Sequence, residues 1–427
     1  MKNKSIILCT VLSIGIALSA IGQSISVVKS EESGLSLDRL ESIDRILNEY
    51  VDQEEVAGGV ALIALKGKIG YLKAFGMKDI DSKQPMKTDD IFRIASMTKA
   101  ITVAGVMMLF EDGYFTLDDP LSKFIPEFSE MQVMVEDTAN KSYTLEKAKS
   151  QITIRHLLTH TSGLTYDFFS QPYISEIYTQ NNIYNGLGES EGTIGDMVKR
   201  LTKLPLVNHP GEGWQYGMNM DVLGYLIEII SGQTFDEYLR DNIFEPLQMN
   251  NTYFYLPKQK KDRIATLYGF NSLGRLIKLE GTSDNGYHSD IDVHESNKSY
   301  FSGGAGLVST AEDYYKFLQM LLNNGFYNNK KLLSRKTIEL MTSEQTGDNF
   351  EWWKGHGFGF GFAISRGPMF TGNPGSEGTY SWVGYFATNY WVDPKEELIG
   401  IFLTQLNPRK NDMDIKFKNL MYQAINE

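Results

Sequence analysis

Strand-type patterns stand at the two ends of this chain, and helix-type patterns fill the middle. The runs GVALIAL and IGYLKAFG, joined by turn residues 66–68, predict a β-hairpin over 58–76. Between Phe358 and Gln405, short apolar or alternating runs separated by Gly and Asp-Pro predict a set of antiparallel strands. The simplest arrangement pairs these two distant segments in one sheet, with the helices inserted between them.

Apolar residues at helical spacing predict the helices that would cover this sheet. The first helix is predicted from Leu37 to Val51, and a strongly apolar helix is predicted from Ser96 to Phe110. Further helical segments are predicted at 153–159, 192–203, 219–231, 235–248, 310–324, 335–342 and about 413–425.

The predicted fold class is α+β: an antiparallel β-sheet flanked by helices, with a mostly helical lobe inserted. One domain is expected over 37–425. Its sheet lobe takes about 37–95 and 300–425, and its helical lobe takes about 115–290. A cleft between two lobes is the usual place for a ligand site.

The first 22 residues have the pattern of a secretory signal peptide. Lys2 and Lys4 give a positive start, an uncharged apolar run follows from Ser5 to Ala20, and residues 20–22 form a small-x-small cleavage signal. We therefore expect an exported protein, periplasmic or extracellular, with no stable membrane span after signal removal. The alternative is an uncleaved N-terminal anchor.

The segment after the predicted signal is Ser- and Glu-rich, and residues 23–36 are expected to be a flexible leader. Cys9 is the one cysteine of the sequence and belongs to the predicted signal. No disulfide, cysteine nucleophile or thiolate metal site is therefore expected in the mature chain.

The composition and the absence of common motifs exclude several classes. With 42% hydrophobic and 22% charged residues among 427, the chain is typical of an ordinary globular protein. It has 41 Lys+Arg against 53 Asp+Glu, and this acidic balance argues against a nucleic-acid partner. The motifs G-x-S-x-G, G-x-x-x-x-G-K-[ST] and H-E-x-x-H are absent, and the six histidines show no metal-ligand spacing. Neither a metal nor an organic cofactor is expected.

The residues that remain for chemistry begin with Ser96-Met97-Thr98-Lys99. Positions i and i+3 share a helix face, so the Ser96 hydroxyl would lie beside the Lys99 amine. Burial would lower the pKa of the lysine, and a neutral amine can take the proton that the serine oxygen must lose to become a nucleophile. The alternative is that Ser96 is the N-cap of an ordinary helix.

Two further segments are candidates for the same site. Tyr216 follows a loop and precedes an apolar helix, so its hydroxyl could point into the cleft; the alternative is that it only packs. The predicted strand around Trp382 and Tyr385 could aim a backbone N–H at a developing oxyanion, with the N–H of Ser96 as second donor. A plain core strand is the alternative there.

Taken together, these segments resemble the penicillin-recognising serine hydrolases: class C β-lactamases, D-alanyl-D-alanine carboxypeptidases and family VIII carboxylesterases. The matching stretches follow the family's order over about residues 40–425. They are Ile91–Lys99, Ile152–Leu164, Pro210–Glu228, Ser302–Asp313 and Trp382–Gln405. The resemblance implies a β-lactamase/transpeptidase-like fold, which agrees with the strand and helix order predicted above.

Carried over residue by residue, the resemblance implies a role for each motif. Ser96 resembles the acylated nucleophile, Lys99 its partner, and Tyr216 the tyrosine that moves protons between nucleophile, base and leaving group. The backbone N–H groups of Ser96 and Tyr385 resemble the oxyanion hole. Which of Lys99 and Tyr216 is the base stays open.

Two departures from the lactamase pattern indicate the esterase branch. The position two residues after the family tyrosine, usually Asn, is Met218 here, with Asn219 one residue late; we assign both to the substrate pocket. Where Lys-Thr-Gly or His-Thr-Gly is usual, this chain has Trp382, Val383 and Gly384. Losing that cation weakens the binding of an anionic substrate and favours neutral acyl esters.

We therefore expect a secreted serine hydrolase, a carboxylesterase that acts on a small-molecule acyl ester through an acyl-enzyme on Ser96. Two alternatives stay open: a β-lactamase or D-Ala-D-Ala carboxypeptidase acting on β-lactams or peptidoglycan peptides, and a non-catalytic penicillin-binding-like protein. The Asp- and Asn-rich segment Gly281–Asn297 is expected to be a solvated loop, with a flexible lid or a calcium-binding loop as alternatives.

Overall fold

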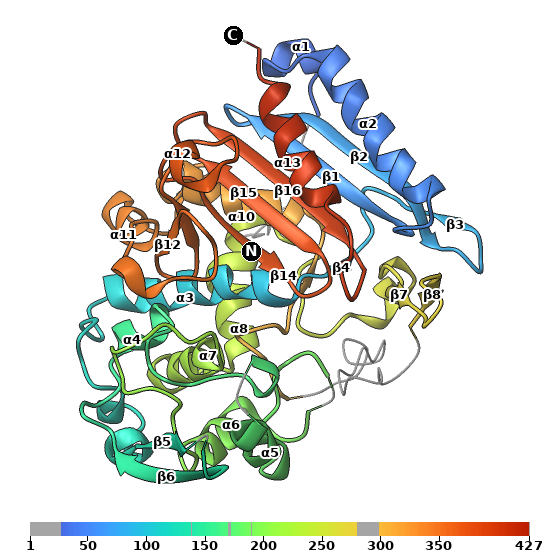
Figure 1. Cartoon of the computed structure of the whole chain (residues 1–427). Helices are drawn as coiled ribbons and strands as arrows, with labels where there is room; N and C mark the ends of the chain where they lie inside the picture. The colour runs from blue at the N-terminus through green and yellow to red at the C-terminus, as the bar shows by residue number, and fades with distance from the viewer. Residues whose placement is uncertain (1–26, 138, 170–171, 189, 280–298, 427) are drawn as a thin grey trace, which may run out of the picture.

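Eight strands form one antiparallel sheet in the computed structural model, which describes residues 27–426 except 138, 170–171, 189 and 280–298 (Figure 1). The strand order is β12-β13-β14-β15-β16-β1-β2-β3. Strand β1 pairs with β16, with Gly59 opposite Thr404, so the N-terminal hairpin and the C-terminal strands share one sheet as predicted. The bounds are Gly58–Leu65 (β1), Lys68–Asp79 (β2), Gln84–Pro85 (β3), His356–Phe358 (β12), Ala363–Ser365 (β13), Tyr380–Gly384 (β14), Thr388–Asp393 (β15) and Leu398–Thr404 (β16).

Helices cover both faces of the sheet, which explains why every residue of β1, β15 and β16 is buried. Helices α2 and α13 pack on one face, where Ile63 points, and α3 and α10 belong to the core on the other face, where Leu62 points (Figure 1). Successive side chains of these strands point alternately into two cores, so the sequences of the strands are nearly continuous apolar runs. The bounds are Leu37–Asp52 (α2), Thr98–Glu111 (α3), Ala311–Leu322 (α10), Arg335–Met341 (α11), Pro368–Thr371 (α12) and Met413–Gln423 (α13).

The inserted part of the chain is mainly helical but more segmented than the sequence predicts. The helix predicted at 235–248 is α8 (Phe235–Leu239), a π-helical turn (Arg240–Phe244) and α9 (Glu245–Leu247). Pro246 lacks a backbone N–H and cannot donate to a regular helix there. The other helices are Ile154–Leu158 (α4), Pro172–Gln180 (α5, not predicted), Ile194–Leu201 (α6) and Asn219–Ser231 (α7).

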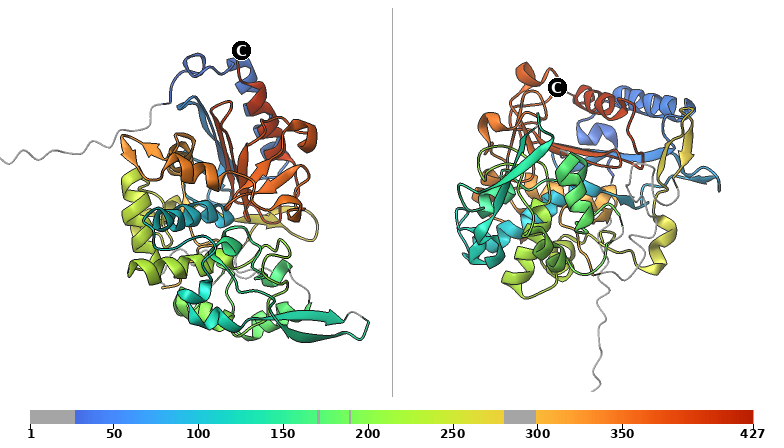
Figure 2. Two further views of the ribbon diagram at one scale, coloured as in Figure 1. Left: turned by 90° about the vertical axis from the view of Figure 1, so that its left-hand side faces the viewer. Right: turned by 60° about the horizontal axis from the view of Figure 1, so that its bottom comes forward.

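Two hairpins in the inserted segment of the chain are absent from the sequence-based prediction. The hairpin of β5 (Gln132–Asp137) and β6 (Ser142–Lys147) projects from the molecule (Figure 2), and all six residues of β6 are exposed. In β6 the apolar residues Tyr143 and Leu145 alternate with polar ones, yet neither side chain faces the core. The second hairpin joins β7 (Tyr268–Phe270) to β8 (Leu276–Lys278).

Of the segment 23–36, expected to be a flexible leader, the structure describes residues 27–36, and these contact the sheet lobe. The backbone N–H of Val28 donates to the carbonyl of Ile69 in β2 at 3.0 Å, and the N–H of Ser36 donates to the carbonyl of Ala424 at 2.8 Å. Between them lies α1 (Ser30–Ser33), and Leu35 is fully buried. Residues 27–36, which precede α2, are therefore hydrogen-bonded both to strand β2 and to Ala424 near the C-terminus.

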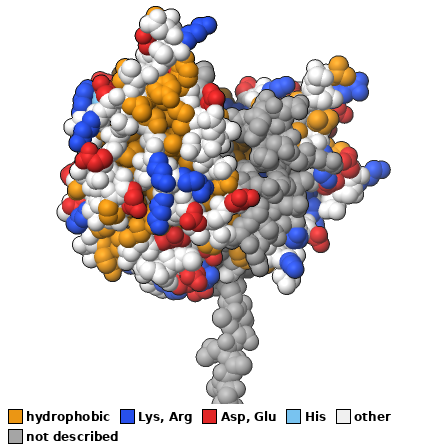
Figure 3. Space-filling view, turned by 90° about the horizontal axis from the view of Figure 1, so that it is seen from below, with side chains coloured by type: hydrophobic (Ala, Val, Ile, Leu, Met, Phe, Trp, Pro, Cys, Tyr) orange, Lys and Arg blue, Asp and Glu red, His pale blue; other side chains and the backbone are white. Residues whose placement is uncertain are grey.

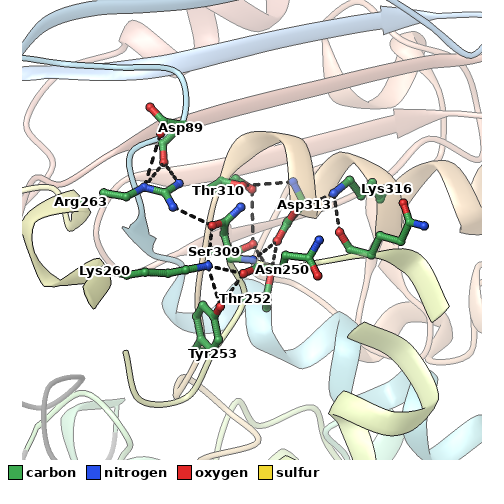
Figure 4. Close-up of polar contacts among 12 residues, drawn as sticks. Asp89, Asn250, Thr252, Tyr253, Lys260, Arg263, Ser309, Thr310, Asp313 and Lys316 are labelled. Atoms are coloured by element: carbon green, nitrogen blue, oxygen red, sulfur yellow. Dashed lines mark hydrogen bonds and ion pairs between the residues drawn. The ribbon is translucent and has the colours of Figure 1, made fainter. Parts of the chain in front are cut away.

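A polar network fixes the short strand behind the predicted nucleophile (Figure 4). Strand β9 (Val308–Ser309) pairs with β4 (Phe92–Arg93), which leads into the S-x-x-K segment. The hydroxyls of Ser309 and Thr252 share a hydrogen bond of 2.8 Å, and the buried carboxylate of Asp313 accepts from the N–H of Asn251 at 2.6 Å. Buried polar groups with partners hold their segments in one arrangement, so this network holds β9 against β4.

The surface seen from below carries patches of hydrophobic side chains between charges of both signs (Figure 3). Exposed apolar side chains on the β5–β6 hairpin are Val135, Tyr143 and Leu145.

Within the described part of the chain, no helix has the length and apolar character needed to span a bilayer. The predicted signal peptide and the loop predicted at Gly281–Asn297 lie outside the described residues. The remaining strands are Phe326–Tyr327 (β10) and Lys330–Lys331 (β11).

Candidate active site

Ser96 lies where the chain turns from β4 into α3. Ala95 has a φ of 42°, in the left-handed region that residues other than glycine rarely adopt, and Ala95–Met97 form a 3₁₀ turn. The turn leaves Ser96 partly exposed between two buried neighbours. The predicted helix is present, but it begins at Thr98 with Met97 as its N-cap, so Ser96 is not the cap of an ordinary helix.

Lys99 lies one turn further along and is almost completely buried. Its Nζ donates to Ser96 Oγ at 3.1 Å and to the carbonyl oxygen of Gly304 at 2.7 Å, with the ring centroid of Tyr216 4.5 Å away. Burial lowers the pKa of Lys99 to about 7, although the carboxylate of Asp221 acts in the opposite direction. A neutral amine can donate to Gly304 and keep its lone pair for the Ser96 proton.

Tyr216 brings its hydroxyl into the same cluster from the helical lobe. Its oxygen accepts a hydrogen bond from the indole N–H of Trp382 at 3.1 Å and shares another with Ser96. Burial raises the pKa of Tyr216 above its ordinary value, so the phenol keeps its proton at neutral pH. The following residue, Gly217, runs so close to the carbonyl of Leu164 that a Cβ would overlap it, which is why glycine is needed there. The three predicted catalytic side chains therefore meet.

Strand β14 forms the wall that faces Ser96. Gly384 runs against the backbone carbonyl of Ile94, so any larger residue would push the strand away from the turn that carries the serine. Ser96 and Tyr385 line one cavity, as a pair of oxyanion donors requires. The role of their two N–H groups stays a prediction.

The cavity beside Ser96 is small, about 110 Å³, and mainly apolar. The predicted site residues that line it are Ser96, Tyr216, Trp382, Val383, Gly384 and Tyr385. Aromatic residues that the sequence analysis did not assign also line it: Tyr166, Phe168, Phe169 and Trp352. These four lie in segments with no motif of their own, so nothing in the sequence singled them out.

Met218 and Asn219 do not line the cavity, and their assignment to the substrate pocket is wrong. The chain enters α7 at this point, so both side chains turn into the core, where Met218 is 1% exposed and Asn219 is fully buried. Asn219 accepts from Ser162 Oγ at 2.5 Å and shares a hydrogen bond of 2.8 Å with His160 Nδ1. It ties α7 to the loop that follows α4.

A buried carboxylate that the sequence analysis did not assign lies behind Lys99. Asp221 Oδ1 accepts from Ser302 Oγ at 2.7 Å and from the Tyr300 hydroxyl at 3.2 Å. Burial raises the pKa of Asp221, and the nearby Lys99 partly counteracts this. The signal in the sequence was the acid Asp221 in the first turn of a largely apolar helix. Burying a carboxylate costs free energy unless it has hydrogen-bond or charged partners.

A buried histidine lies beside this cluster. The ring of His160 lies 4.9 Å from that of Tyr216, and burial lowers the pKa of this histidine, so it stays neutral. Among the described residues, no group of three or more His, Cys, Asp or Glu side chains could hold a metal ion. The arrangement is suited to proton transfer and nucleophilic attack by a serine.

Comparisons with known sequences agree with this chemistry. The family model described as Beta-lactamase matches residues 43–423. The chain is 33% identical over 378 residues to "Protein Rv1367c" of Mycobacterium tuberculosis, covering 85% of this chain and 89% of the relative. It is 28% identical over 372 residues to "Esterase EstB" of Burkholderia gladioli, with the same coverage.

Comparisons with solved structures agree as well. The structure titled "EstCE1, a hydrolase with promiscuous acyltransferase activity" superposes with a TM-score of 0.78 at 25% identity, covering 90% of this chain and 98% of the other. Simvastatin Synthase (LovD) from Aspergillus terreus gives a TM-score of 0.75 at 26% identity, with coverage of 91% and 98%. The strands, the helices and the S-x-x-K site thus have one explanation: the chain belongs to the beta-lactamase family and is a serine hydrolase.

Proposed function

We propose that this protein is an exported esterase that hydrolyses small, neutral acyl esters through an acyl-enzyme on Ser96. One observation carries the proposal: the Nζ of buried Lys99 lies 3.1 Å from Ser96 Oγ beside a small aromatic cavity. An amine that burial keeps partly neutral is the base that a serine hydroxyl needs.

In the first step, Lys99 takes the proton of Ser96. The pKa shifts favour this assignment over Tyr216, since the lysine is partly neutral near pH 7 and the tyrosine is protonated. Ser96 Oγ then bonds to the ester carbonyl carbon, and the carbonyl oxygen becomes an anion. The backbone N–H groups of Ser96 and Tyr385 are the donors that we assign to this anion.

In the second step, the bond between the carbonyl carbon and the alcohol oxygen breaks. Tyr216 gives its proton to the departing alcohol and regains one from Lys99, which is neutral again. The acyl group stays on Ser96 Oγ until a water molecule loses a proton to Lys99 and attacks the same carbon. The carboxylic acid leaves, and Ser96 regains its proton.

The lining of the cavity supports a neutral substrate. None of the described residues that line it is Lys, Arg, Asp or Glu, and Trp382 occupies the position where the family motif has a cation. An anionic group in this cavity would lose its hydration without gaining a charged partner, which is unfavourable. The names of the relatives, which include an esterase and acyltransferases, support acyl transfer from esters.

A serine-directed phosphonate probe with intact-mass readout tests the nucleophile. Wild type should gain one adduct and Ser96→Ala none; equal labelling of both would contradict the assignment. Parallel assays with nitrophenyl acyl esters, a chromogenic cephalosporin and a D-Ala-D-Ala peptide test the substrate. A dominant cephalosporin or peptide rate would overturn the ester assignment in favour of a β-lactamase or carboxypeptidase.

Export rests on the pattern of residues 1–22 and has its own test. Fractionation of cells expressing the full chain, with N-terminal sequencing of the product, should give a protein outside the cytoplasm that begins near residue 23. A full-length product in the cytoplasm would contradict export and leave the catalytic proposal standing.

A further inference from the structure

Two aromatic side chains from different lobes form the rim of the cavity beside Ser96. Phe169 is 47% exposed and Trp352 is 43% exposed, whereas Tyr216 and Trp382 deeper in the cavity are 5% and 1% exposed. Phe169 ends the 3₁₀ turn Asp167–Phe169 of the helical lobe. Trp352 lies in the sheet lobe, between the 3₁₀ turn at 347–349 and strand β12.

The two rings meet across the rim and also pack on the catalytic tyrosine. Their centroids are 5.0 Å apart in an edge-to-face arrangement, and they lie 5.8 Å (Phe169) and 5.0 Å (Trp352) from the ring of Tyr216. Trp352 is parallel to Trp382, with 2° between the planes and 6.4 Å between the centroids. A substrate chain that leaves the cavity along the ring of Tyr216 therefore meets Phe169 and Trp352.

The volume of the cavity sets how much can fit beneath these rings. At about 110 Å³ it is smaller than a cavity of about 150 Å³ that holds benzene, and far below the roughly 300 Å³ of a site for a drug-sized ligand. An acetyl, propionyl or butyryl group is of the right size, and an octanoyl chain is not.

We propose that Phe169 and Trp352 form an aromatic gate that restricts the acyl group of the substrate to short chains. The inference rests on the proposed esterase function. It adds that acyl length is limited by a contact between two half-exposed rings of different lobes, so that removing either ring opens the same exit.

The experiment compares nitrophenyl acetate, butyrate, octanoate and dodecanoate as substrates of wild type, Trp352→Ala and Phe169→Ala. The readout is the ratio of kcat/KM for octanoate to that for butyrate. We expect a ratio below about one tenth in wild type and a rise of at least about tenfold in each variant. The matched control is Phe326→Ala, at a side chain that is 48% exposed on β10 and does not line the cavity; its ratio should equal that of wild type.

The double variant sharpens the test. Because both rings close one opening, removing the second should add less than removing the first, and the two effects should not be additive. An unchanged ratio in both single variants, or a wild type that already prefers octanoate, would overturn the gate. A wild type that hydrolyses no ester, or that the phosphonate probe does not label, would contradict the esterase proposal instead.

Folding is checked by near-ultraviolet circular dichroism and thermal melting. Should Trp352→Ala fail to fold, Phe169→Leu decides the question, since it keeps an apolar side chain at a half-exposed position and removes the ring. Its octanoate-to-butyrate ratio should rise at least about threefold. A ratio equal to that of wild type in folded Phe169→Leu would overturn the gate.

Discussion

The sheet side and the helical lobe contribute to the site in different ways. On the sheet side, Lys99 lies on α3 and Ser96 lies in the 3₁₀ turn directly before it. Ten of the first eleven residues of α3 are buried, as is every residue of strands β1, β15 and β16. From the helical lobe, Tyr216 and Phe169 come from a loop and a single 3₁₀ turn. The nucleophile and its base are thus held by elements with few alternative arrangements, whereas Tyr216 and Phe169 lie on connecting segments, which tolerate change more readily.

If this division is correct, the largest effect comes from the buried amine on the sheet side. Lys99→Met should lower kcat/KM by at least about 10²-fold, because proton transfer is lost. Its melting temperature should rise, since the pKa of Lys99 is lower in the folded state and the unfolded state binds the proton more tightly. Ester hydrolysis and thermal melting measure the two effects.

A second buried lysine provides the control for that experiment. Burial also lowers the pKa of Lys418, which lies on α13 and does not line the cavity. Lys418→Met should keep wild-type activity. Near-wild-type activity of Lys99→Met would remove Lys99 from the mechanism.

The next effect comes from the helical lobe. Tyr216→Phe keeps the ring that packs beside Lys99 but removes the hydroxyl that meets Ser96 and Trp382. We expect kcat/KM to fall by about 10²-fold, as for the loss of an acid catalyst. Tyr380→Phe, also at a buried tyrosine but outside the cavity, should have little effect. Equal rates of Tyr216→Phe and wild type would show that the lobe supplies no proton donor.

A smaller effect is expected in the pH dependence of kcat/KM, which distinguishes the role of Lys99 from that of its neighbours. Because protonated Lys99 cannot take the serine proton, kcat/KM for a neutral ester should rise about tenfold from about pH 6 to about pH 8. Asp221 raises the pKa of Lys99, so Asp221→Asn should move the midpoint of this rise to lower pH. A profile that is flat over this range in wild type contradicts Lys99 as the base.

The smallest effect on activity is expected in the sheet itself. Leu62 is fully buried in β1, and Leu62→Ala should lower the free energy of unfolding by about 2–5 kcal/mol. Well below the melting temperature, kcat/KM should change less than about threefold, because other elements hold the site. Denaturant unfolding and ester hydrolysis on one preparation test both statements. A large loss of activity in the folded variant would show that the sheet core and the site are coupled.

Much of the fold was predictable because its signals are local. The runs that became β1, β2 and β14–β16 are apolar or alternating and are separated by Gly or Asp-Pro. The spacing of Leu40, Ile43 and Leu47 shows the buried face of α2. The exposed hairpin of β5 and β6 was not predicted, and the helix predicted at 235–248 is present but divided by a π-helical turn. In both places contacts with the rest of the lobe decide the conformation.

For the site, the sequence by itself determined the pair Ser96 and Lys99, because a spacing of three residues in one helical turn brings two side chains together without help from the rest of the chain. Only the tertiary structure decided that Lys99 is buried between two tyrosine rings, that Asn219 serves the core, and that Phe169 meets Trp352. Burial and contact between segments far apart in the chain depend on how the lobes pack, and no local pattern of residues encodes that packing.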